Sequence, residues 1–72
     1  MAHWEIRIPT VTADQRDGVQ VFTYSAERCP LQLQAKRQAR VDVDSADAIR
    51  HRRGADARLD AIKAIWHETY EF

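Results

Sequence analysis

Arginine is concentrated in one short stretch, residues 48–60, where four arginines and one histidine surround Gly54. A guanidinium group presents a planar set of N–H donors that matches a phosphate or a carboxylate group. This stretch could therefore bind the phosphates of a nucleic acid or an acidic protein surface. The structural interpretation is that the same residues finish a helix, because cations in a last turn interact favourably with the helix dipole, by roughly 0.3–1 kcal/mol each.

The distribution of charge favours a protein partner over a nucleic acid. Residues 36–58 carry seven Lys or Arg against four Asp, which gives +3, while residues 1–35 sum to −1 and residues 59–72 to −2. The chain is therefore neutral, and its aspartates lie between its arginines, unlike the basic surface of a dedicated nucleic-acid binder. We expect docking on a protein, and a DNA- or RNA-binding regulator that uses the basic end of the central helix is the alternative.

Arginine and aromatic side chains are the best candidates for contacts with a partner, because these residue types dominate the binding energy of protein interfaces. Six aromatic residues are also many for a core of this size. The predicted partner-binding residues are Arg37, Arg40, Arg50, Arg52, Arg53, Arg58, Tyr24 and Tyr70.

Residues that could support catalysis or bind a metal are few and unfavourably spaced. The three histidines do not stand at HExxH spacing, the two glycines cannot form a phosphate-binding loop, and neither serine lies in a GxSxG motif. Cys29 alone can form neither an internal disulfide nor a finger-type zinc site. We therefore predict a protein that is not an enzyme, with no catalytic residue, no metal and no cofactor.

The length of 72 residues predicts a single small domain of marginal stability. The single cysteine is typical of a protein from a reducing compartment. The N-terminus lacks the apolar core of a signal peptide, and no run of about 18 apolar residues could span a membrane. We expect a cytoplasmic protein that does not enter a membrane.

The first predicted strand begins near residue 3, where Trp4, Ile6 and Ile8 alternate with charged residues. This period of two is typical of a strand with one buried face. Pro9 has no N–H to donate to a neighbouring strand, so we expect the strand to lie at a sheet edge near that residue.

A second strand is predicted at residues 19–25, which are rich in β-branched and aromatic side chains. Asp17 and Gly18 form a turn dipeptide before it, so residues 3–25 should form a β-hairpin. Apolar residues stand at both odd and even positions of this strand, which suggests a bulge or burial of both faces. The outer edge of this second strand would be open to strand addition by a partner or by a second copy, which predicts a homodimer unless a C-terminal strand covers it.

A long central helix is predicted at residues 30–53. With Pro30 at its first position and Gly54 as its C-cap, apolar residues recur every three or four positions along one stripe. The stripe consists of Leu31, Ala35, Ala39, Val43, Ala46 and Ile49. The alternative is a helix that breaks near residue 44, with Asp44 or Ser45 as a new N-cap.

The C-terminal element, residues 55–72, has two interpretations. Its Ala, Leu and Lys content favours a helix that reaches Tyr70. The last seven residues are instead prone to form a strand, which would extend the hairpin into a three-stranded sheet. Both interpretations give an α+β fold in which Trp4 and Ile6 pack against the central helix.

The function expected for this fold is docking by a small accessory or inhibitory protein, of the kind that phages and mobile elements encode.

Overall fold

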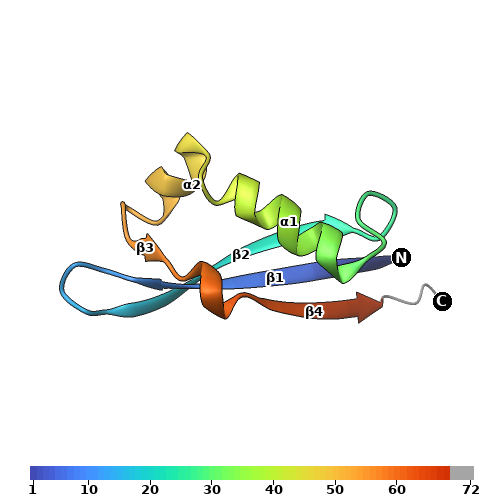
Figure 1. The fold of residues 1–72 in the computed structure, drawn as a ribbon, viewed down its shortest axis with the longest axis horizontal. Helices are drawn as coiled ribbons and strands as arrows, with labels where there is room; N and C mark the ends of the chain where they lie inside the picture. The colour runs from blue at the N-terminus through green and yellow to red at the C-terminus, as the bar shows by residue number, and fades with distance from the viewer. Residues whose placement is uncertain (69–72) are drawn as a thin grey trace.

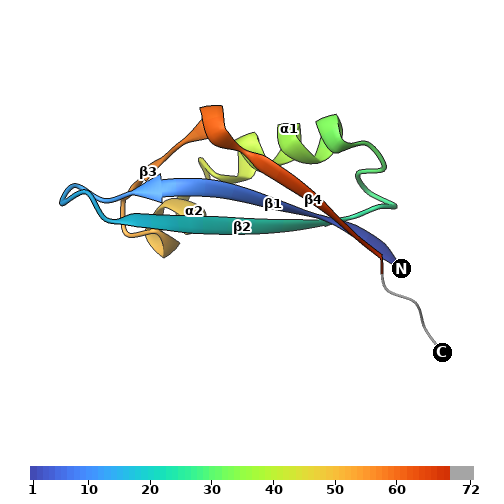
Figure 2. The same cartoon turned by 90° about the horizontal axis from the view of Figure 1, so that it is seen from below.

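The computed structural model describes residues 1–68 and shows a small α+β fold in two layers (Figures 1 and 2). Both helices lie on one face of a twisted antiparallel sheet. The elements in chain order are β1 (Ala2–Val11), β2 (Asp17–Ser25), α1 (Gln32–Asp42), α2 (Ala46–His51), β3 (Asp56–Ala57), the 3-10 helix η1 (Leu59–Ala61) and β4 (Lys63–Glu68).

The predicted N-terminal hairpin is confirmed, and its register is continuous. Strands β1 and β2 pair without a bulge from His3 opposite Ser25 to Val11 opposite Asp17. Because alternate residues point to opposite faces, the expected buried face of β1 meets one face of β2, and the exposed Val19 and Val21 lie on the other.

The turn of the hairpin comes earlier than the predicted Asp17–Gly18 dipeptide. Residues 12–16 form it, with Gln15 at a φ of 68°, and the Thr12 N–H donates to the Arg16 carbonyl over 3.0 Å. Gly18 instead lies within β2 and opposite Thr10, where a Cβ would come within 2.8 Å of the threonine Oγ1. The glycine is needed for this close approach between strands.

Strand β1 is the central strand of the sheet, so the predicted edge position near Pro9 is wrong. Strand β4 pairs with residues 2–7 of β1, and β3 pairs with Thr10 and Val11. Pro9 lies between these two ladders, where its missing N–H removes no strand bond. The segment between β3 and β4 lies beside Pro9, and the Arg58 N–H donates to the Pro9 carbonyl over 2.8 Å.

The described part of the C-terminal element contains strand β4, so the favoured helix is wrong there and the alternative of a C-terminal strand is confirmed for residues 66–68. The strand begins earlier than predicted, at Lys63, and the sheet has four strands rather than three. It pairs with β1 and leaves the outer edge of β2 uncovered. Trp66 lies opposite Trp4, and their rings meet edge to face with centroids 4.8 Å apart. Ala64 lies opposite the fully buried Ile6. These cross-strand contacts outweigh the helix preference of the local sequence.

The predicted long central helix is wrong, and the alternative that it breaks near residue 44 is confirmed. Helix α1 has Leu31 at its N-cap, one residue after Pro30, and ends at Asp42. Ser45 then caps α2, and its hydroxyl accepts from the Ala48 N–H over 3.2 Å. The break changes the phase of the buried stripe, so Ala48 is buried while Ile49 is exposed.

Helix α2 ends two residues earlier than predicted, because Gly54 is not its C-cap. Arg52 is the C-cap, and both Arg53 and Gly54 adopt left-handed backbone, with φ of 53° and 76°. The Gly54 N–H donates to Ile49 and the Arg53 N–H to Arg50, the bond pattern of a Schellman motif.

The core lies between β1, β2 and α1. Ile6, Ile8 and Val43 are fully buried, and Ala35 and Ala39 let α1 approach the sheet closely. The predicted packing of Ile6 is confirmed for Ala35 and Ala39, and Trp4 is partly buried against the same cluster. It is wrong for Leu31 and Ile49 of the predicted stripe, which are 62% and 42% exposed. Cys29 is a free thiol in this core. Within residues 1–68, no helix has the length and apolar character needed to cross a membrane.

Candidate functional site

The outer side of β2 is an open sheet edge. The Thr12 N–H donates to Arg16 at one end of the hairpin, and the Ala26 N–H donates to Ala2 at the other. In an antiparallel pair, residues that exchange hydrogen bonds alternate with residues that do not. Both terminal bonds fit the pattern in which the even-numbered residues of β2 bond to β1. The main-chain groups that point away from β1 therefore belong to Asp17, Val19, Val21, Thr23 and Ser25.

This edge lacks the usual protection against pairing. Natural edge strands are interrupted by charged residues, prolines or bulges, whereas residues 18–25 contain no charged residue and no proline. Val19 and Val21 are 58% and 46% exposed. Within the described residues, no segment pairs with the main chain of Val19, Val21 or Thr23 on this side. The opposite edge is the shorter strand β4, which has Lys63 and Glu68 at its ends.

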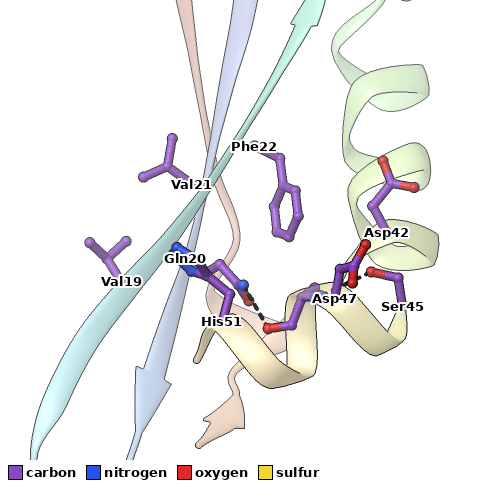
Figure 3. A pocket seen from close by; sticks show the side chains of 9 residues that line it. Val19, Gln20, Val21, Phe22, Asp42, Ser45, Asp47 and His51 are labelled. Atoms are coloured by element: carbon purple, nitrogen blue, oxygen red, sulfur yellow. Dashed lines mark hydrogen bonds between the residues drawn. The ribbon is translucent and has the colours of Figure 1, made fainter. Parts of the chain in front are cut away.

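An open groove of about 650 Å³ runs beside this edge, between β2 and the connection from α1 to α2. Figure 3 shows Gln20 and Phe22 pointing from β2 toward the helices, while Val19 and Val21 point away from them. The groove is lined by Val19, Gln20, Val21, Phe22, Asp42, Ser45, Asp47, Ala48 and His51. Its floor on β2 therefore combines the ring of Phe22 with the amide of Gln20, and its wall carries the polar side chains of Asp42, Ser45, Asp47 and His51.

A buried amide fixes the floor of the groove. The Gln20 Nε2 donates to the Ala48 carbonyl over 3.0 Å, and its Oε1 accepts from Arg52 Nη1 over 3.2 Å. The same guanidinium donates to the carbonyls of Val43 and Ala55 at 2.6 and 2.7 Å. These bonds hold α2 on β2, so the position of the groove wall is set by the fold.

A second polar contact fixes the wall at the end of α1. The Tyr24 hydroxyl donates to Asp42 Oδ2 over 2.6 Å, and Gln38 Nε2 donates to Asp42 Oδ1 over 3.0 Å. Burial of the hydroxyl, together with its bond to Asp42, raises the pKa of Tyr24 above its ordinary value. Asp42 has no ion-pair partner among residues 1–68, and Asp47 pairs with Arg50 at 3.6 Å.

Comparison with protein-family models, with curated proteins and with solved structures found no match for this chain. Within residues 1–68, no three His, Cys, Asp or Glu side chains are grouped so that they could hold a metal ion.

A histidine pair lies on the sheet face opposite the helices. The rings of His3 and His67 stack with centroids 4.9 Å apart. The His67 Nε2 lies 3.4 Å from Glu5 Oε1, within ion-pair distance but without the geometry of a hydrogen bond. Arg7 donates to Glu5 over 2.5 Å, and this bond lowers the pKa of Glu5. These contacts link β1 to β4, so the two histidines have a structural role in the sheet.

The residues predicted from the sequence to bind a partner are distributed over several elements. Arg37 and Arg40 are exposed on α1, Arg50 and Arg53 at the end of α2, and Arg58 before η1. Arg52 is engaged by three internal hydrogen bonds.

The two predicted tyrosines are not on the described surface. Tyr24 is buried, and its hydroxyl supports Asp42 at the groove wall. Tyr70 lies outside the described residues.

The open edge of the second strand can be predicted from the sequence, but the groove cannot. Its lining residues Gln20, Ser45, Ala48 and His51 come from two elements, and neither pattern nor motif connects them. The sequence feature that indicates the open edge is the uncharged run of residues 18–25.

Proposed function

We propose that this chain is a non-enzymatic binding module that docks on another protein by accepting an extended segment at the open edge of β2. The supporting observation is the uncharged edge beside a preformed groove. In strand addition, main-chain hydrogen bonds supply affinity and pockets for alternate side chains supply specificity. Here the open edge offers the main-chain groups, and the groove offers a pocket for side chains.

A partner strand would bond to the outward main-chain groups of Val19, Val21 and Thr23. Every second side chain of that strand would point toward the helices, into the groove lined by Phe22 and Ala48. Covering such an edge would also protect a small domain from self-association. We assign the chain to the class of accessory or inhibitory proteins, of the kind that phages and mobile elements encode. Its free thiol, Cys29, fits a cytoplasmic location.

Affinity capture with edge variants tests this proposal. Val21→Pro removes one outward N–H at an edge position where proline is tolerated, and Val21→Thr is the matched control that keeps this donor and the branched side chain. We expect a host protein that is retained by the wild type and by Val21→Thr but lost from Val21→Pro. Circular dichroism establishes that all three chains are folded. Equal retention by Val21→Pro would show that docking does not use this edge.

The alternative function is nucleic-acid binding by the basic end of α2. Arg50, Arg53 and Arg58 are exposed and support it. Two observations weaken it, because Arg52 is committed to internal hydrogen bonds and four aspartates lie among the basic residues 36–58. Few guanidinium groups then remain for phosphates, and docking on a protein is the better-supported function.

A further inference from the structure

We infer that the segment accepted by β2 carries a basic side chain on its helix-facing side, so that a lysine or arginine of the partner protein lies against Asp42 and Asp47. This inference rests on the proposed strand addition at β2, and it specifies the chemistry of the partner.

The position of an added strand is fixed by sheet geometry. Such a strand lies about 4.8 Å from β2 and directs alternate side chains toward the helices. These side chains would enter the groove between Phe22 on the floor and the wall that carries Asp42 and Asp47 (Figure 3). A lysine or arginine fits this path, because its aliphatic stem packs on apolar surface while its charged head reaches a polar rim.

The wall presents two carboxylates, and the fold holds that of Asp42 in place. The two oxygens of Asp42 accept from Tyr24 and Gln38, which are neutral donors, so its negative charge is positioned without being balanced by an ion pair. The Asp47 side chain is 93% exposed, and its ion pair with Arg50 is of the weak surface type. A carboxylate already fixed in place loses little freedom when it binds a cation.

A second copy of the chain fits this groove less well than a basic segment does. Antiparallel pairing of two β2 strands about a two-fold axis would place the helices of both copies on the same face of one sheet. The acidic walls would then approach each other across the axis. The helix-facing side chains that the second β2 would offer are Gln20, Phe22 and Tyr24, and none of them is basic.

Three synthetic peptides of equal length test the inference on the full chain. Valine alternates with lysine in the first, with glutamine in the second and with glutamate in the third. Binding is measured by NMR titration, together with the exchange rates of the Val19, Val21 and Thr23 amides. We expect the lysine peptide to bind most tightly and the glutamate peptide most weakly, and the edge amides to exchange more slowly in the lysine complex.

Charge-removing variants of the wall locate the effect. Asp47→Asn and Asp42→Asn should each weaken binding of the lysine peptide by about two- to fivefold, the range for a single exposed ion pair. Binding of the glutamine peptide should not change. Asp56→Asn removes the same charge from β3, on the other side of β1, and should leave both affinities unchanged. If Asp42→Asn fails to fold, the exposed Asp47 position still decides the test.

The outcomes separate this inference from the proposed function. Equal binding of all three peptides with protected edge amides would keep strand addition and overturn the basic side chain. Lysine-peptide binding that Asp47→Asn does not weaken would also overturn it. Edge amides that none of the peptides protects would overturn both proposals. A dimer in sedimentation, with edge amides protected in the absence of peptide, would make a second copy the occupant.

Discussion

Arg52 Nη1 donates to the main-chain oxygen of Val43 over 2.6 Å, which joins the end of α2 to the end of α1. Val43 is the C-cap of α1, where the helix dipole places partial negative charge. The same side chain bonds to Ala55 and to Gln20 of β2. One arginine of the basic stretch therefore stabilises the junction of both helices with the sheet.

Removal of this guanidinium should destabilise the fold. We expect Arg52→Gln to lower the free energy of unfolding by about 1.5–3 kcal/mol, the range for hydrogen bonds to a charged group. Arg50→Gln, which removes only an exposed ion pair, should cost less than about 1 kcal/mol. Urea denaturation monitored by tryptophan fluorescence measures both. Equal losses for the two variants would contradict the structural role of Arg52.

Ile6 tests the assignment of the two sheet faces. Its side chain is fully buried beneath α1, so Ile6→Ala should cost about 2–5 kcal/mol. Val19 lies on the opposite face and is 58% exposed, and Val19→Ala should cost less than about 1 kcal/mol. Thermal and urea unfolding check both values, and a change of less than about 0.5 kcal/mol for Ile6→Ala would refute the assignment.

The hairpin could be predicted from sequence because the alternation of Trp4, Ile6 and Ile8 is a local pattern. The break between the helices was also visible, since Ser45 is a strong N-cap residue. The contacts that stabilise this break come from residues outside the break itself. Tyr24 holds the end of α1, and Arg52 closes the junction from beyond α2.

The C-terminal strand and the groove depend on contacts that no sequence window contains. Residues 63–68 form a strand because Trp66 and Ala64 find partners on β1. The sequence predicted an open edge, but that edge stays open because β4 joins the other side of β1. The groove exists only after α2 is placed against Gln20.

Tyr24 should make stability depend on alkaline pH. Its raised pKa means that the folded state holds the hydroxyl proton more tightly than the unfolded state does. Its contribution to stability is complete below the unfolded pKa of about 10 and is lost as the pH rises above that value. We expect Tyr24→Phe to be less stable by about 1 kcal/mol at neutral pH.

The difference between wild type and Tyr24→Phe should then shrink above about pH 10, because the variant has no hydroxyl to ionise at this position. Urea denaturation of both proteins across the alkaline range measures it. Stability curves that remain parallel above pH ~10 would show that neither burial nor the bond to Asp42 raises the pKa of Tyr24 in the folded protein.

The exposed arginines distinguish protein docking from nucleic-acid binding. If Arg50, Arg53 and Arg58 contact phosphates, the logarithm of the affinity for duplex DNA must fall with the logarithm of salt concentration, with a slope of about −0.9 per contact. Replacing Arg50 and Arg53 with glutamine would then flatten that slope by about two units. We expect instead that binding to DNA and RNA is weak at physiological salt before and after this double substitution. Fluorescence anisotropy over a range of salt concentrations checks this expectation. Submicromolar, salt-dependent binding that the double variant loses would favour the nucleic-acid regulator over the docking module.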